Sequence, residues 1–148
     1  MFSKEEAKQI RQDFWIFFGK RYPRKWLLYH TKLKDFSLKF DFDTKKAIVA
    51  FDLEHADELD RAYYFDKLVS LKKLLLEEVS PDFIFDEEYV LANGKLISRC
   101  YLQLDEVSIH NKKTWPEVFE FFYIYMDRME VFFWEYEGFI KAWRAHTN

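Results

Sequence analysis

The sequence predicts an α+β domain in which three helices pack on an antiparallel sheet, in the order α-β-β-α-β-β-β-α. Apolar and polar residues alternate over much of residues 36–53, which is typical of half-buried strands, and Asn93-Gly94 is the strongest hairpin signal in the chain. Three other stretches carry apolar residues at three- and four-residue spacing, which predicts helices. No βαβ repeat is evident, so hairpins should build the sheet. We expect positions 1–148 to form one domain.

The first helix is expected to begin with a capping box. The Ser3 hydroxyl can accept a backbone N–H, while the Glu6 carboxylate reaches back to the cap. Gly19 and Pro23 predict that the helix ends near residue 20. Its apolar stripe comprises Ala7, Ile10, Phe14, Phe17 and Phe18.

The first strand pair follows a basic stretch. One strand is predicted from the alternation of Phe36, Leu38, Phe40 and Phe42 with polar residues, and the second covers residues 47–53. The polar residues 43–46 between them predict a turn, so the pair should form an antiparallel hairpin.

A second helix is expected to begin at Asp57 and Glu58, because acids favour the positive end of the helix dipole, and to end at Pro81. Its apolar stripe comprises Leu59, Ala62, Tyr63, Leu68, Leu71, Leu75 and Val79. Another β region begins at residues 83–85. Asn93-Gly94 then joins a strand at residues 88–91 to one at residues 96–104, through a type I′ turn that needs positive φ at both positions.

The last helix is expected to begin at Thr114, with Glu117 completing a second capping box and Pro116 in the first turn. One apolar stripe comprises Val118, Phe122, Tyr125, Met129, Phe132, Tyr136, Phe139 and Trp143, and a second comprises Phe119, Phe121, Ile124, Val131, Phe133 and Ile140. A helix this apolar must be covered on more than one face. The second stripe should therefore lie either beneath the first helix or in a homodimer interface.

Composition excludes several classes of protein. Glycines 19, 94 and 138 stand too far apart for a phosphate-binding loop, and the lone Cys100 excludes an internal disulfide and a cysteine-based zinc site. The N-terminus lacks the pattern of a secretory signal, and no apolar run is long enough to span a membrane. These features predict a cytoplasmic protein without a membrane partner.

Net charge is −3, yet residues 20–34 contain six cations and no acid. The candidate anion or nucleic-acid contacts in this stretch are Lys20, Arg21, Arg24, Lys25, Trp26, Tyr29, Lys32 and Lys34. Cations can neutralise phosphates while aromatic rings stack on unpaired bases, a combination found in proteins that bind single strands. The alternative is a solvated loop whose aromatic residues anchor it to the core.

Catalytic and metal sites are weakly indicated. The acids of residues 52–60 surround His55 and could hold a divalent cation, but capping of the following helix explains most of them. Asp43-Thr44-Lys45 is a D-x-K sequence and Pro81-Asp82 a P-D dipeptide, the two parts of a PD-(D/E)XK nuclease motif. Here the D-x-K falls in a predicted turn and the two parts come in the wrong order. We therefore assign no catalytic residue, no metal ligand and no cofactor.

Several blocks in order resemble a bacterial and archaeal family of unknown function, whose members occur alone or C-terminal to PD-(D/E)XK nuclease-like domains. The blocks are residues 13–18, the hairpin of residues 36–53, residues 65–78, Phe83-Ile84-Phe85-Asp86, and Trp115-Pro116-Glu117 before an aromatic helix. The resemblance covers roughly positions 5–141 and looks like the stand-alone form. It implies an accessory module linked to nucleic-acid processing or defence and carries over no catalytic residue.

These observations together predict a non-catalytic binding module. Its partner would be a protein, a second copy of the chain, or a nucleic acid bound at residues 20–34. The alternative is a metal-dependent, nuclease-like phosphodiesterase.

Overall fold

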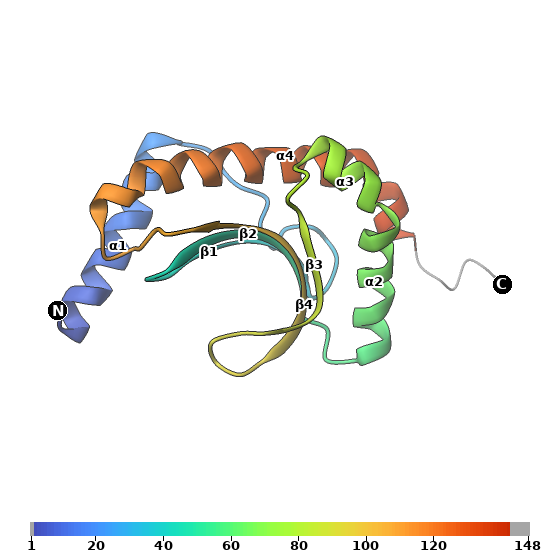
Figure 1. The fold of residues 1–148 in the computed structure, drawn as a ribbon. Helices are drawn as coiled ribbons and strands as arrows, with labels where there is room; N and C mark the ends of the chain where they lie inside the picture. The colour runs from blue at the N-terminus through green and yellow to red at the C-terminus, as the bar shows by residue number, and fades with distance from the viewer. Residues whose placement is uncertain (1, 143–148) are drawn as a thin grey trace.

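The computed structural model describes residues 2–142, which form four α-helices and four strands and confirm the α+β class (Figure 1). In chain order the elements are α1 (Lys4–Arg21), β1 (Phe36–Phe42), β2 (Lys46–Leu53), α2 (Glu58–Ser70), α3 (Lys72–Glu78), β3 (Ile84–Val90), β4 (Leu96–Asp105), the 3₁₀ turn η1 (Lys112–Thr114) and α4 (Trp115–Lys141). Trp143, assigned above to an apolar stripe, lies outside the described residues. No helix in residues 2–142 is long and apolar enough to cross a membrane.

The sheet is antiparallel throughout and has the strand order β1-β2-β4-β3. The predicted first hairpin is confirmed, with Phe36 opposite Leu53 and Phe42 opposite Ala47. Because side chains alternate along a strand, half of the side chains of β1, β2 and β4 point to one face of the sheet and half to the other. The helices pack on one of these two faces.

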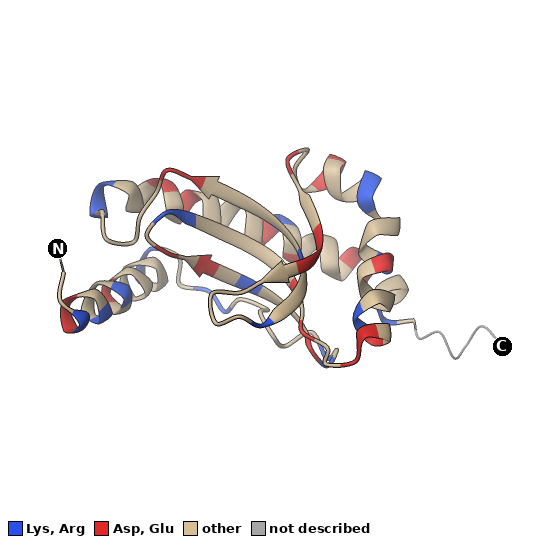
Figure 2. Cartoon of the chain, turned by 60° about the horizontal axis from the view of Figure 1, so that its bottom comes forward, with Lys and Arg blue, Asp and Glu red and all other residues tan. Residues whose placement is uncertain are grey.

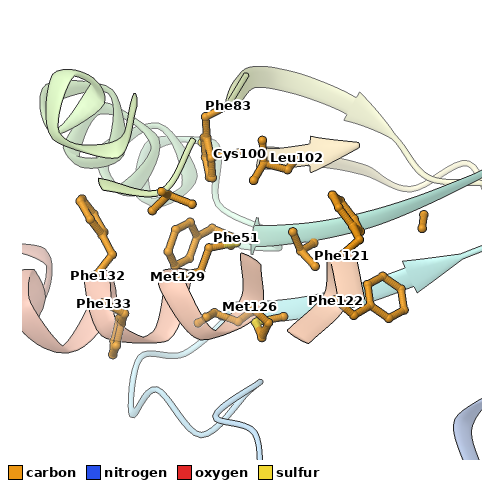
Figure 3. Close-up of a cluster of buried hydrophobic side chains, with 14 of the residues drawn as sticks. Phe51, Phe83, Cys100, Leu102, Phe121, Phe122, Met126, Met129, Phe132 and Phe133 are labelled. Carbon is orange, nitrogen blue, oxygen red and sulfur yellow. The ribbon is translucent and has the colours of Figure 1, made fainter. Parts of the chain in front are cut away.

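The main core lies between this face of the sheet and α4. Most of the length of α4 lies across the sheet (Figure 1). Figure 3 shows Met129 of α4 beside Phe51 of the sheet, and both are buried. Helix α1 adds Phe14, whose ring lies 5.3 Å from Trp115 and 6.0 Å from Phe122 of α4. Helices α2 and α3 pack near the other end of α4.

The other face of the sheet is concave, and no helix of residues 2–142 covers it (Figure 1). At its centre Arg99, 1% exposed, donates two hydrogen bonds to Asp52, 0% exposed, at 2.7 and 2.9 Å. The Arg99 guanidinium also lies 4.5 Å from the Tyr89 ring centroid and 3.4 Å from Asp41. Burial alone would lower the pKa of Arg99, but the hydrogen bonds and charge of Asp52 outweigh burial and raise it.

Beside this pair, Lys39 and Lys95 each lie 3.0 Å from a different oxygen of Glu54. Partial burial would raise the pKa of Glu54, but the two ammonium groups lower it below its ordinary value. The charges at the centre of the concave face are therefore satisfied by one another.

Three of the predicted elements are divided differently in the structure. The second helix is two helices, α2 and α3, so the prediction of three helices was wrong. The chain tightens at Leu71, whose N–H bonds to Leu68 O, and Leu71 is itself buried. The two β segments predicted at residues 83–85 and 88–91 are one strand, β3, with an irregularity between Asp86 and Tyr89.

The turn after β3 is a hairpin, as predicted, but it is not type I′. Only Gly94 has positive φ (88°), because the turn is wider than two residues: Gly94 N–H bonds to Leu91 O and Leu91 N–H to Lys95 O. The Asn93 side chain instead accepts a hydrogen bond from Lys95 N–H.

Only one of the two predicted capping boxes is present. Ser3 and Glu6 form theirs, whereas Thr114 makes no side-chain cap. The Thr114 hydroxyl is already used by the preceding turn, where it lies 2.7 Å from Asn111 O and 2.9 Å from Ser108 O.

The second apolar stripe of α4 is covered in part. Phe119 packs against α1, 5.1 Å from the Phe14 ring, and Phe121, Phe133 and Ile140 are buried. Ile124 and Val131 are exposed. Phe119 is therefore partly buried beneath the first helix, which agrees with one of the two alternatives, and the homodimer stays a prediction.

Replacing Arg99 by Met should lower the free energy of unfolding by about 3–5 kcal/mol, because Asp52 would remain buried without its two hydrogen bonds, with only Lys39 Nζ left near it at 3.8 Å. The double variant Arg99→Met/Asp52→Leu should lose less, since no unpaired charge remains. Urea unfolding of the three proteins measures both losses. Single and double variants of equal stability would contradict this account.

Candidate nucleic-acid interface

Residues 20–34, hereafter the basic segment, run from the end of α1 to the beginning of β1 beside α4 (Figure 1). Figure 2 shows Lys and Arg spaced along this coil. Beyond Arg21 the segment contains no helix or strand. Specific side-chain and backbone contacts must therefore fix the path of its backbone.

The first of these contacts is made by Glu130, a buried carboxylate on α4. It accepts hydrogen bonds from the Leu27 N–H at 2.6 Å and from Arg24 Nη2 at 2.7 Å. Arg24 Nη1 also binds Asp127 at 2.8 Å. Arg24, one of the candidate anion contacts, therefore has two carboxylates of the protein as its partners.

Trp26 belongs to the same internal cluster. The Arg24 guanidinium lies 3.9 Å from its ring centroid, and the Phe18 ring is nearly parallel to it at 6.1 Å. Phe40 and Tyr123 approach the Trp26 ring at 5.4 and 5.8 Å. Trp26 is therefore largely engaged in packing, as the alternative of an anchored loop predicted for it.

A second fixed point is Thr31, which is buried. Its hydroxyl donates to Phe36 O at 2.7 Å and accepts from Leu33 N–H at 3.1 Å. Leu28, Lys32 and Asp35 have positive φ, so the chain turns sharply around this point.

The remaining candidates are open to solvent. Lys20, Arg21, Lys25, Lys32 and Lys34 are exposed, and none forms an ion pair with another residue of the described range 2–142. Tyr29 is 72% exposed and its ring lies 4.7 Å from the His30 ring. These cations and Tyr29 are available to a ligand.

Helix α4 adds Trp134, which sequence reasoning missed. Trp134 is 52% exposed and borders two grooves, of about 390 and 170 Å³. Lys25 and His30 line the larger groove with it, and His30 and Lys32 line the smaller one. The sequence did contain one signal for an exposed Trp134, since this residue belongs to neither of the two apolar stripes predicted for the last helix.

Two acids also border these grooves, and both are paired. Glu130 binds Arg24 and Leu27 as described, and Glu137 lies 2.8 Å from Lys141 Nζ. Lys25 and Lys32 therefore contribute positive charge beside Trp134 that no acid of residues 2–142 pairs with.

The parts of the nuclease motif are not assembled into a metal site. Asp43 lies in the turn after β1, where its side chain accepts hydrogen bonds from Lys45 and Lys46 N–H at 2.7 and 2.9 Å. Asp82 lies in another turn, where its N–H bonds to Ser80 Oγ. Within residues 2–142 no three His, Cys, Asp or Glu side chains are grouped to hold a metal ion.

Three of the acids of residues 52–60 serve separate structural roles. Asp52 pairs with Arg99, Glu54 binds Lys39 and Lys95, and Asp57 caps α2 by accepting from Leu59 N–H at 2.8 Å.

His55, between them, is 8% exposed and borders a cleft of about 310 Å³ that is also lined by Asp35 and Asp57. Its ring stacks on Tyr64 at 5.1 Å, and neither ring nitrogen has a hydrogen-bond partner among the described residues. Burial lowers the pKa of His55, and the charges of Asp35 and Asp60 only partly oppose this.

A family model described as Domain of unknown function (DUF4268) matches residues 10–137. Searches of curated proteins and of solved structures return no match.

The attachment of the basic segment can be tested at Glu130. Glu130→Gln removes the charge that Arg24 binds and should lower the free energy of unfolding by about 1–3 kcal/mol. Trypsin should also cleave faster after Lys25. Asp127→Asn is the matched control and should cost at most about 1 kcal/mol, because that carboxylate is half-exposed. Equal losses in the two variants would refute a special role for Glu130.

Acid should destabilise the protein through His55. Because its pKa is lower in the folded than in the unfolded state, the unfolded state binds the proton more tightly. The stability that neutral His55 contributes is therefore complete above the ordinary pKa of 6.5 and declines as pH falls below that value. His55→Phe keeps the stack on Tyr64 and should show a smaller loss of thermal stability between about pH 7.5 and 5.5. An unchanged pH dependence would count against this assignment.

Proposed function

This chain belongs to the DUF4268 family, and from that premise and the geometry above we propose that it is a single-domain, non-catalytic accessory module that binds nucleic acid. The contact surface is Lys25, His30 and Lys32 of the basic segment together with Trp134 of α4. Lys20, Arg21, Tyr29 and Lys34 extend this surface along the segment.

The observation that carries the proposal is the exposed Trp134 ring between grooves lined by lysines that form no ion pair within residues 2–142. Binding of single strands combines cations that neutralise phosphates with aromatic rings that stack on bases. If the lysines served only to keep the basic segment solvated, the half-exposed Trp134 ring beside them would have no role.

The charge distribution limits how strong this binding can be. The six cations of the basic segment give +6, so the rest of the chain carries −9, and Arg24 is already bound to Asp127 and Glu130. Five cations remain, which limits the salt dependence for a single strand to a slope of about −3.5 in a log–log plot. We therefore propose that the protein contacts a short stretch of nucleic acid and binds it with moderate affinity.

The biological setting is part of the same proposal. The family resemblance supports a role beside nucleic-acid processing or defence enzymes, and the free, buried Cys100 is compatible with a reducing cytoplasm. Exposed apolar side chains on α1 and α4, among them Ile16, Phe17 and Val131, leave room for a protein partner or a second copy of the chain.

The nucleic-acid proposal is tested by fluorescence anisotropy with a short single strand at about 50 and 200 mM salt. Lys25→Glu/Lys32→Glu should weaken binding at least about tenfold, since two phosphate contacts become repulsive. Trp134→Ala should weaken it about 5- to 100-fold through loss of stacking.

Lys73→Glu/Lys113→Glu is the matched control, because it changes net charge equally at exposed sites in α3 and η1. Equal weakening by the control pair would show that only net charge matters and would contradict the proposed surface. Binding should survive EDTA. Magnesium-dependent cleavage of the strand, abolished by EDTA, would instead support the nuclease-like alternative.

A further inference from the structure

A separate apolar groove of about 290 Å³ lies where α1, the basic segment and strand β1 meet. Trp15 of α1, Leu28 and Tyr29 of the basic segment, and Leu38 and Phe40 of β1 line it. Trp15 and Tyr29 are both exposed in part, so aromatic rings from two elements are accessible at the groove.

The groove offers few polar groups to a ligand. Besides the Tyr29 hydroxyl and the Trp15 indole N–H, the polar side chains that line it are Ser37 and Lys39, and the Lys39 ammonium is bound to Glu54 at 3.0 Å. The Leu38 N–H is bound to Leu28 O at 3.0 Å. Stacking and apolar contact are therefore the main interactions available there.

This groove adjoins the proposed nucleic-acid surface. The Tyr29 ring lies 4.7 Å from the His30 ring, and His30 lines both grooves that Trp134 borders. Tyr29 and His30 therefore connect the apolar groove to Lys25 and Lys32, which have no ion-pair partner in the part of the chain that the structure describes.

We infer that the apolar groove holds one unstacked base of a single-stranded nucleic acid, whose backbone continues across Lys25 and Lys32. The inference rests on the proposed function and specifies its substrate as single-stranded. A base in a duplex is already stacked on its neighbours, so only an unpaired base can offer its face to Tyr29 and Trp15. Since hydrogen-bond groups are few, the groove accepts any base, with purines favoured by their larger faces.

An extended peptide fits this place less well. A peptide would have to pair with the edge of β1, where the basic segment already occupies the backbone. Leu33 O accepts from the Phe36 N–H, Thr31 Oγ1 donates to Phe36 O, and Leu28 O accepts from the Leu38 N–H. The positive charge of the basic segment also complements the phosphates of a nucleic acid.

The test compares three probes of equal length: a purine-rich single strand, the same strand with consecutive abasic positions, and the duplex. Wild-type protein should bind the intact strand about 5- to 100-fold more tightly than the abasic strand, and more tightly than the duplex. Tyr29→Ala should remove this preference, and Tyr29→Phe should retain it. Tyr29 is 72% exposed, so unchanged thermal unfolding of both variants will show that the fold is intact.

The outcomes separate the two proposals. If the wild type binds with steep salt dependence but does not distinguish intact from abasic strands, or if Tyr29→Ala keeps the preference, the base site is overturned while the proposed function stands. If the wild type binds none of the three probes, both fail. Lys25→Glu/Lys32→Glu should weaken binding of intact and abasic strands alike, because those residues contact phosphates.

Discussion

The structure depends on one constraint: α4 is apolar around much of its circumference and must be covered on several sides. The sheet covers one side, α1 a second, and α2 and α3 a third near the far end of the helix (Figure 1). The basic segment covers a further flank through Trp26, Leu27 and Tyr22. The basic segment is thus held against α4 because its apolar side chains cover an apolar flank of that helix.

This arrangement divides the cations of the basic segment into two groups. Arg24 faces the carboxylates of α4 and fastens the coil, whereas Lys25 and Lys32 remain without partners among the described residues. Glu130 and Thr31 fix the backbone on either side of Tyr29. Ordering the coil in advance reduces the entropy that a ligand would otherwise lose in organising it. The same contacts that complete the core therefore prepare the exposed side chains for binding.

The sequence predicted the features whose determinants are local. The capping box at Ser3 and Glu6 and the alternation in residues 36–53 depend on neighbours a few positions away, and both were right. The last helix does begin after Thr114 and Asn93-Gly94 does lie in a hairpin turn, but the capping box at Thr114 and the turn type at Asn93-Gly94 were predicted wrongly. Each motif is compatible with more than one set of hydrogen-bond partners, and residues outside the motif, Ser108 and Leu91, decided between them. The role of Arg24 could not be predicted, since its partners lie about a hundred positions further along the chain. Trp134 was missed for the same reason: only the tertiary structure brings it beside Lys25 and Lys32.

The two outer strands of the sheet have a consequence for how molecules of this protein meet at high concentration. An exposed strand with unpaired backbone groups is a template on which another chain can add and start a fibril. On β1 the basic segment already bonds to Phe36 and Leu38, and on β3 the ladder is interrupted beside Glu87 and Glu88, both exposed acids. Neither outer strand therefore presents a long, flat row of free N–H and C=O groups. In a chain with 21% aromatic residues, these blocked edges help to keep native molecules apart and resist amyloid-like assembly.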